Sequence, residues 1–140
     1  MNFMEIFNNV MTTATDIAVA SESGGQPNVR LMSFFYDSDQ KGVIYIVTFA
    51  GSTKTLEFSA NCKAAFSTIP AENGPHVRAQ IACCKKSVLS LDDIKSKYLE
   101  KNPFFVELFE QMGSALEVWE ITFKEADIIV DMQNESKITL

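Results

Sequence analysis

Apolar side chains recur with helical spacing in the first part of the chain. From Phe3 to Met11 they occupy positions i, i+3, i+4, i+7 and i+8, which lie on one face of a helix. After Met11 the pattern changes to short runs rich in β-branched and aromatic residues, separated by glycine, proline, asparagine and aspartate. This change predicts an N-terminal helix followed by strands that are joined by turns.

Strand-like runs recur through most of the remaining sequence. They cover residues 16–20, 28–36, 43–48, 63–69, 77–88, 117–123 and 126–131. The first three follow one another without a helix between them, so we expect a three-stranded meander rather than a parallel sheet. Many short strands favour a nearly closed barrel, because closure removes exposed sheet edges. The sequence therefore predicts one mainly β domain over residues 1–140, a six- to seven-stranded antiparallel barrel with flanking helices.

Three further helical segments are expected between the later strands. Ser52 is a good N-cap for a short helix after the third strand. Residues 90–93 resemble a capping box that opens a helix through Tyr98. Pro103 suits the first position of another short helix, and Gly113 ends it.

Charge and hydropathy narrow the range of partners. The formal net charge is -6, and the 12 basic residues are scattered, which argues against nucleic acid or an anionic membrane surface as the main partner. No apolar run approaches the ~20 residues that span a bilayer, and the N-terminus lacks the pattern of a signal peptide. We therefore expect a cytoplasmic protein without membrane segments.

The cysteines and the single histidine give no framework for a metal site. Cys62, Cys83 and Cys84 are odd in number, and adjacent strand residues such as Cys83 and Cys84 point to opposite faces. They are therefore poor disulfide partners or joint ligands, and we expect reduced thiols. His76 has no nucleophile motif or ligand spacing around it, which favours a solvent-facing loop histidine.

Two features between residues 30 and 55 carry candidate chemistry. Arg30 lies mid-strand between apolar neighbours, where a charge requires an anionic ligand or a carboxylate. Residues 52–55, which we call the phosphate cradle, combine the hydroxyls of Ser52, Thr53 and Thr55 with the charge of Lys54. A helix that begins there also offers free backbone amides to an anion. The alternative is a capped surface helix with a solvated lysine.

The order of short motifs along the chain resembles the pyridoxamine 5'-phosphate oxidase-related family of FMN-binding split barrels. The likeness extends from Ala18 to about Val130. It is carried by Gly25-Gln26-Pro27-Asn28-Val29-Arg30, by Tyr45-Ile46-Val47-Thr48, by Gly51-Ser52-Thr53-Lys54 with Leu56, Phe58 and Asn61, and by Val77-Arg78-Ala79-Gln80-Ile81.

This resemblance implies an FMN site at the interface of a homodimer. The strand with Arg30 would run beside the flavin ring and its phosphate, the end of the next strand would line the flavin, and the cradle would bind the phosphate. His76 would supply a polar contact. The implied cofactor-binding residues are Arg30, Leu31, Met32, Ser33, Val47, Thr48, Ser52, Thr53, Lys54 and His76.

The resemblance also implies a flavin-dependent oxidoreductase with NADH or NADPH as a possible electron donor. The flavin itself supplies the redox chemistry, so no catalytic side chain is assigned. Thr53 stands where the family often has a second basic residue, and the Arg-x-His segment that grips pyridoxamine phosphate is missing. Oxidation of vitamin B6 is therefore not expected.

Two alternatives remain open at this stage. The first is a non-catalytic protein that binds or senses a flavin. The second is a relative that binds haem on the same barrel, with His76 as the axial ligand. Arg78 is likewise open between a flavin contact and an ion pair across the barrel.

Overall fold

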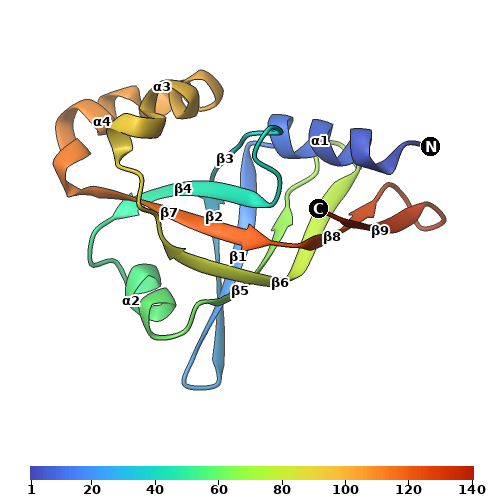
Figure 1. The fold of residues 1–140 in the computed structure, drawn as a ribbon, viewed down its shortest axis with the longest axis horizontal. Coiled ribbons are helices and arrows are strands. Elements are labelled where there is room, and N and C mark those ends of the chain that lie inside the picture. Colours follow the sequence, from blue (N-terminus) through green and yellow to red (C-terminus); the bar gives the residue numbers. More distant parts are fainter.

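The computed structural model describes residues 1–140, with four α-helices around one curled sheet (Figure 1). The helices are α1 (Phe3–Thr13), α2 (Thr53–Ala60), α3 (Leu91–Lys101) and α4 (Val106–Met112), with short 3-10 turns at Pro103–Phe105 and Gly113–Ala115. The strands are β1 (Asp16–Ser23), β2 (Gln26–Ser33), β3 (Phe35–Tyr36), β4 (Val43–Phe49), β5 (Lys63–Thr68), β6 (His76–Lys86), β7 (Leu116–Phe123), β8 (Glu125–Ile129) and β9 (Glu135–Thr139).

The nine strands form one antiparallel sheet that curls into a split barrel. Its main path runs β2-β1-β5-β6-β7-β4-β3, and the β8–β9 hairpin joins it by pairing with β6. Strands β2 and β3 are neighbours in the chain but lie at opposite ends of this path, so the sheet must bend round to bring its ends together. The predicted antiparallel barrel with flanking helices is confirmed.

The expected three-stranded meander is wrong because the strand predicted over residues 28–36 breaks at Phe34. Its first part pairs with β1, and its last part pairs with β4, where Tyr36 lies opposite Ile44. Phe34 itself is fully buried, and its carbonyl accepts a hydrogen bond from Asn102 Nδ2 at 3.2 Å instead of from a strand. The other neighbour of β4 is β7, not β2.

The strand β9 was not expected from the sequence. Its side chains alternate between exposed and half-buried, so they lack a strong apolar face. Asp131 forms the turn before it, because its Oδ1 accepts from the backbone amides of Gln133 and Asn134, both at 2.8 Å. The turn brings β9 back along β8.

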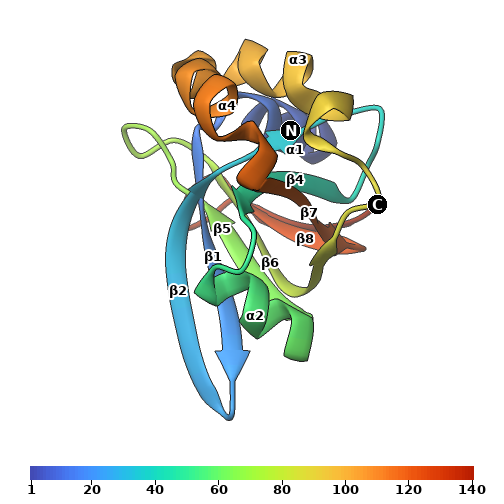
Figure 2. The ribbon, with the colours of Figure 1, turned by 90° about the vertical axis from the view of Figure 1, so that its left-hand side faces the viewer.

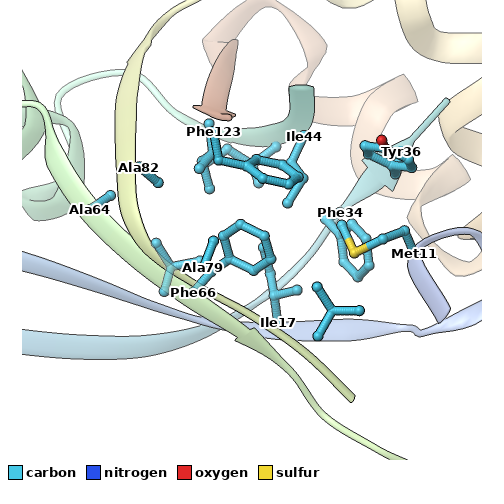
Figure 3. Packing of buried hydrophobic residues seen from close by; sticks show 14 of the residues in the cluster. Met11, Ile17, Phe34, Tyr36, Ile44, Ala64, Phe66, Ala79, Ala82 and Phe123 are labelled. Atoms are coloured by element: carbon cyan, nitrogen blue, oxygen red, sulfur yellow. The ribbon is translucent and has the colours of Figure 1, made fainter. Parts of the chain in front are cut away.

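The core fills the inside of the barrel, and a second cluster lies outside it. In the main cluster, Phe66 and Tyr36 both pack on Phe123, and α1 contributes Met11 (Figure 3). Phe7 of α1 belongs to the same cluster. The outer cluster joins α3 and α4 to β4 and β7, and it contains Tyr45, Ile94, Tyr98, Phe109, Leu116 and Val118.

The helices therefore cover different parts of the sheet. Figure 2 shows α3 and α4 together at one end of the barrel, and α2 beside the long β1–β2 hairpin at the other end. None of the helices has the length and apolar character needed to cross a membrane.

Candidate functional site

An open cleft of about 380 Å³ lies where strands β2 and β4, helix α2 and the α3–α4 region meet. Eight of its 12 lining residues are hydrophobic. They include Leu31 and Met32 from β2 and Val47 and Phe49 from β4. The other four are Asp16, Ser33, Thr48 and Lys54, and Tyr98, one of the eight, adds a hydroxyl. The cleft thus combines an apolar wall with a basic corner.

The structure brings most of the predicted residues to this cleft. Leu31, Met32, Ser33, Val47, Thr48 and Lys54 all line it. Ser52 lies just behind the wall, because its hydroxyl is 3.5 Å from Thr48 Oγ1. Thr53 is exposed at the first position of α2. The sequence motifs that seemed separate along the chain therefore meet in space.

Arg30 is held by the protein's own groups. Its Nη2 donates to Glu57 Oε1 at 2.8 Å, and its Nη1 donates to Ser21 Oγ at 2.8 Å. The guanidinium also lies 5.8 Å from the centre of the Phe58 ring. The sequence predicted either an anionic ligand or a carboxylate as the partner of Arg30. The structure contains the carboxylate, that of Glu57. In this conformation Arg30 ties β2 to α2 and does not line the cleft.

Glu57 is the functional-site residue that sequence reasoning missed. One of its oxygens, Oε1, accepts from Ser21, Asn28 and Arg30. Glu57 lies in α2, and these bonds connect the helix to β1 through Ser21 and to β2 through Asn28 and Arg30. Because the charge of Arg30 lies in the middle of a strand and needs a partner, it could have indicated a nearby carboxylate such as Glu57.

Lys54 differs from Arg30 because it forms no ion pair or hydrogen bond through its ammonium group. Its side chain is half-buried at the edge of the cleft. Burial lowers the pKa of Lys54, and the positive charge of Arg30 lowers it further. Glu57 forms its ion pair with Arg30, and Lys54 has no anionic partner.

The start of α2 presents backbone amides beside Lys54. The first backbone hydrogen bond of the helix runs from Leu56 N to Ser52 O at 3.1 Å. The backbone amides of residues 53–55 therefore have no acceptor within the helix. Ser52 occupies the N-cap position, as predicted, but its hydroxyl makes no capping bond to the helix. It lies 3.5 Å from Thr48 Oγ1 and from Thr55 Oγ1 instead. These amides are left to a ligand or solvent.

His76 and Arg78 lie away from the cleft. His76 is the first residue of β6, half-buried, and opposite Ile129 of β8. Neither His76 nor Arg78 is among the residues that line the cleft. Arg78 forms an exposed ion pair with Asp127 at 3.5 Å. Of the two interpretations of Arg78, the ion pair is the one the structure contains.

The α3–α4 region contributes cleft residues that no sequence motif marked. Tyr98, Phe105 and Leu108 come from this region, and Leu116 opens β7. Burial raises the pKa of the Tyr98 phenol, and the nearby Asp16 carboxylate raises it further. Tyr98 therefore stays a neutral hydroxyl at one side of the cleft.

A larger groove of about 780 Å³ lies on the other side of α4, between the loop after β6 and residues 109–118. It contains none of the predicted cofactor-binding residues. Only Leu116 lines both hollows. We place the candidate site at the smaller cleft because six of the predicted cofactor-binding residues line it and none lines the larger groove.

The curled sheet and the cleft beside α2 are those of a split-barrel protein. The chain belongs to the pyridoxamine 5'-phosphate oxidase-like family, whose sequence model matches residues 10–135. No curated protein matches the chain.

Solved structures share this fold at low sequence identity. ChuZ from Campylobacter jejuni has a TM-score of 0.80 at 13% identity, over 99% of this chain and 61% of its own length. This chain thus spans less than two thirds of ChuZ. A FAD-binding protein from Mesorhizobium loti has a TM-score of 0.65 at 15% identity, over 90% of both chains. A heme binding protein from Mycobacterium smegmatis has a TM-score of 0.70 at 9% identity, over 91% of this chain and 53% of its own.

Proposed function

We propose that this protein binds FMN in the cleft beside α2 and acts as a flavin-dependent oxidoreductase. The observation that carries the proposal is the half-buried ammonium group of Lys54, which has no anionic partner and lies next to Arg30. A phosphate dianion would supply the missing counter-charge. The free amides at the start of α2 point to the same kind of ligand.

The residues present fit a ligand with a phosphate at one end and a flat apolar ring at the other. Lys54 and the amides of residues 53–55 would hold the phosphate. Leu31, Met32 and Val47 would form the bed for the ring. When bound, the flavin would supply the hydride and electron chemistry, and the protein residues would fix its position and exclude water.

The same face supports the proposal of a homodimer. Val29 is 64% exposed, Leu31 67%, Phe49 42% and Leu56 65%, although all four are large and apolar. They come from β2, the end of β4 and α2, the elements that also build the cleft. A second copy that covers these side chains would remove them from water and close the cleft on its open side.

Haem is the second candidate ligand, because one structural neighbour is a heme binding protein. In this chain the only histidine does not line the cleft, so a haem in the same cleft would lack a histidine ligand from its own subunit. The FAD-binding neighbour favours a flavin instead. We therefore assign the cleft to FMN and treat haem as an outcome of the test.

Absorbance titrations of the purified protein test this proposal. FMN, FAD and haemin are added separately to ligand-free protein, and the complex that forms with FMN is then mixed anaerobically with NADH or NADPH. We expect a shifted flavin spectrum that saturates at one FMN per chain and bleaches with one of the two donors. A Soret band with haemin and no flavin complex would contradict the proposal. If a flavin complex forms but neither donor bleaches it, the proposed FMN site stands and NADH and NADPH are rejected as its reductants.

A further inference from the structure

The α3 side of the cleft carries a hydroxyl group that the protein itself does not use. Two of the three tyrosines are hydrogen-bonded: the Tyr36 oxygen accepts from Gly42 N at 3.2 Å, and the Tyr45 hydroxyl donates to Gln40 at 2.8 Å. Tyr98 is only 1% exposed and lines the cleft, yet its hydroxyl forms no hydrogen bond within the chain. Buried hydroxyl groups are normally paired, so this one indicates a ligand in the cleft.

Asp16 supplies a carboxylate without a counter-charge to the same cleft. It is the first residue of β1, pairs with Ser33 at the end of β2, and is half-buried in the cleft lining. Its oxygens accept two long hydrogen bonds, from Thr15 Oγ1 and from Ser33 Oγ, each at 3.4 Å. No lysine, arginine or histidine forms an ion pair with it. A charge that is partly withdrawn from water favours a ligand of opposite charge.

Lys101 of α3 does not neutralise this carboxylate by direct contact. Its Nζ lies 3.4 Å from the centre of the Phe34 ring and has no hydrogen-bond partner. A carboxylate has about four acceptor sites, and Asp16 uses only two of them, both for hydroxyl groups. Asp16 can therefore accept further hydrogen bonds from a donor in the cleft.

Lys54 and Asp16 mark opposite ends of the cleft wall that β2 forms. Arg30 is tied to α2, the helix of Lys54, whereas Ser33 pairs with Asp16. Residues 30 and 33 are separated by three rises of ~3.3 Å, or roughly 10 Å. The two residues between them are apolar and line the cleft. The wall therefore runs from a positive group over an apolar stretch to a negative group.

We propose that Asp16 and Tyr98 bind the ammonium group of a small organic cation. An ammonium group has three donors, so it can donate to the Asp16 carboxylate and to the phenol oxygen of Tyr98 at the same time. The rings of Tyr98 and Phe105 meet edge to face with their centres 5.7 Å apart, and both residues line the cleft. Aromatic rings suit the charge of such a ligand and its apolar body.

The cation would lie beside the flavin ring, at the end of the cleft away from the phosphate. Its role as a substrate of the flavin rests on the proposed function, whereas its binding rests on the cleft alone. An anionic ligand at this end would meet the Asp16 carboxylate and be repelled. The cleft therefore selects amines over neutral and acidic compounds of the same shape.

Calorimetric titration of three compounds that share a phenyl group tests this selection. At neutral pH phenethylamine is a cation, phenethyl alcohol is neutral and phenylacetate is an anion. Each is titrated into the unaltered protein, first without FMN and then with FMN present. We expect the amine to bind about 10-fold more tightly than the alcohol, the low end for a hydrogen bond to a charged group, because Asp16 is only half-buried. Phenylacetate should bind more weakly than either.

Single substitutions assign the preference to the two side chains. Asp16→Asn should lose the preference for the amine, and Tyr98→Phe should weaken amine binding by about 5-fold, since one neutral hydrogen bond is lost. Asp39→Asn is the matched control, because Asp39 is an exposed carboxylate in the turn before β4, and it should bind the amine as the unaltered protein does. If Asp16→Asn fails to fold, the three compounds on the unaltered protein decide the matter.

Three results would overturn the inference: no preference for the amine in the unaltered protein, a preference that survives in Asp16→Asn, or loss of amine binding once FMN is bound. The FMN titration separates this inference from the proposed function. Saturation with FMN without any preference for the amine rejects the cation site alone. A preference for the amine in a protein that binds no FMN keeps the cation site and rejects the flavin.

Discussion

At the scale of single residues, Glu57 determines which cation near α2 remains available to a ligand. Its carboxylate takes Arg30 and leaves Lys54 without an ion pair. The Arg30 side chain is 18% exposed and that of Glu57 is 12%, so the pair is largely shielded from water. A carboxylate at this position also repels a phosphate bound nearby.

The substitution Glu57→Gln separates these two effects. It keeps the size of the side chain but removes its charge, so Arg30 loses its ion pair. We expect the free energy of unfolding in urea to fall by about 1.5–3 kcal/mol, the range for a hydrogen bond to a charged group. The affinity for FMN should increase at the same time, because a negative charge near the phosphate is gone. Weaker binding of FMN by the variant would show that Glu57 shapes the site rather than opposing the ligand.

The amine of Lys101 is buried, so its contribution to stability should depend on pH. Its Nζ lies 3.4 Å from the centre of the Phe34 ring and has no hydrogen-bond partner. Burial lowers the pKa of Lys101 to about 8, and the nearby Asp16 partly offsets this effect. The unfolded chain keeps this proton up to about pH 10.5, the ordinary value for lysine. Since the unfolded state binds more protons in this interval, the contribution of Lys101 to stability rises from about pH 8 to about pH 10.5.

Urea unfolding at a series of pH values measures this contribution as a difference between two proteins. Subtracting the values for Lys101→Met from those of the unaltered protein cancels the titration of the cysteines and tyrosines. We expect the difference to increase with pH across the interval. The exposed Lys124→Met is the matched control and should give a flat difference. A flat profile for Lys101→Met as well would mean that the amine is solvated in the folded protein.

At the scale of secondary structure elements, the turn between β3 and β4 shows a strict requirement for glycine. Gly42 has a φ of 81°, and a Cβ atom there would lie 2.5 Å from the backbone oxygen of Phe123. The same turn is fixed by a bond from Phe123 N to Gly42 O at 3.0 Å. No side chain fits without moving β7.

The substitution Gly42→Ala should lower the free energy of unfolding by about 2 kcal/mol or more, through left-handed backbone strain and the clash with Phe123. Gly24→Ala is the matched control, because Gly24 also has a positive φ, 58°, but has open space around it. It should cost about 1 kcal/mol. Equal losses in the two variants, measured by urea unfolding, would mean that the turn can shift away from Phe123.

Local patterns predicted most elements but not all of their partners. In the strand predicted over residues 28–36, alternation puts Arg30, Met32, Phe34 and Tyr36 on one face, and the structure shows that this face is buried or half-buried. The break at Phe34 was not visible, because it depends on Asn102, 68 residues further along the chain. The capping box of α3 was local and is confirmed, whereas β9 had too weak an apolar pattern to be detected.

The difference between local patterns and contacts of distant segments also explains which residues of the candidate site were predicted. Residues from β2, β4 and α2 were found because short motifs mark them. Tyr98, Phe105 and Leu108 reach the cleft only because the outer cluster packs α3 and α4 on the sheet. Packing between distant segments leaves no motif of its own, so these residues required the structure.

At the scale of the whole molecule, the apolar face around the cleft predicts that two copies associate. Val29 tests this without touching the cleft lining, since its exposed side chain lies on β2 outside the lining residues. We expect Val29→Glu to shift the protein from dimer to monomer in sedimentation equilibrium, because the face would then bury a charge. Met132→Glu, at the exposed tip of the β8–β9 hairpin, should remain a dimer. A monomeric unaltered protein would contradict the homodimer, and a Val29→Glu dimer of unchanged strength would place the interface elsewhere.

The central claim concerns a phosphate group held by Lys54 and the start of α2. Riboflavin carries the same ring as FMN without the phosphate, so comparing the two ligands isolates that end of the site. The most direct measurement is the dissociation constant of each, from quenching of flavin fluorescence, for the unaltered protein, for Lys54→Met and for the exposed control Lys63→Met.

The unaltered protein and Lys63→Met should bind FMN more tightly than riboflavin by about 1.5–3 kcal/mol, or roughly 10- to 150-fold in Kd. In Lys54→Met this preference should shrink or vanish, because FMN binding weakens while riboflavin binding stays the same. Equal affinity of the unaltered protein for FMN and riboflavin, or a phosphate preference that survives in Lys54→Met, would contradict the account.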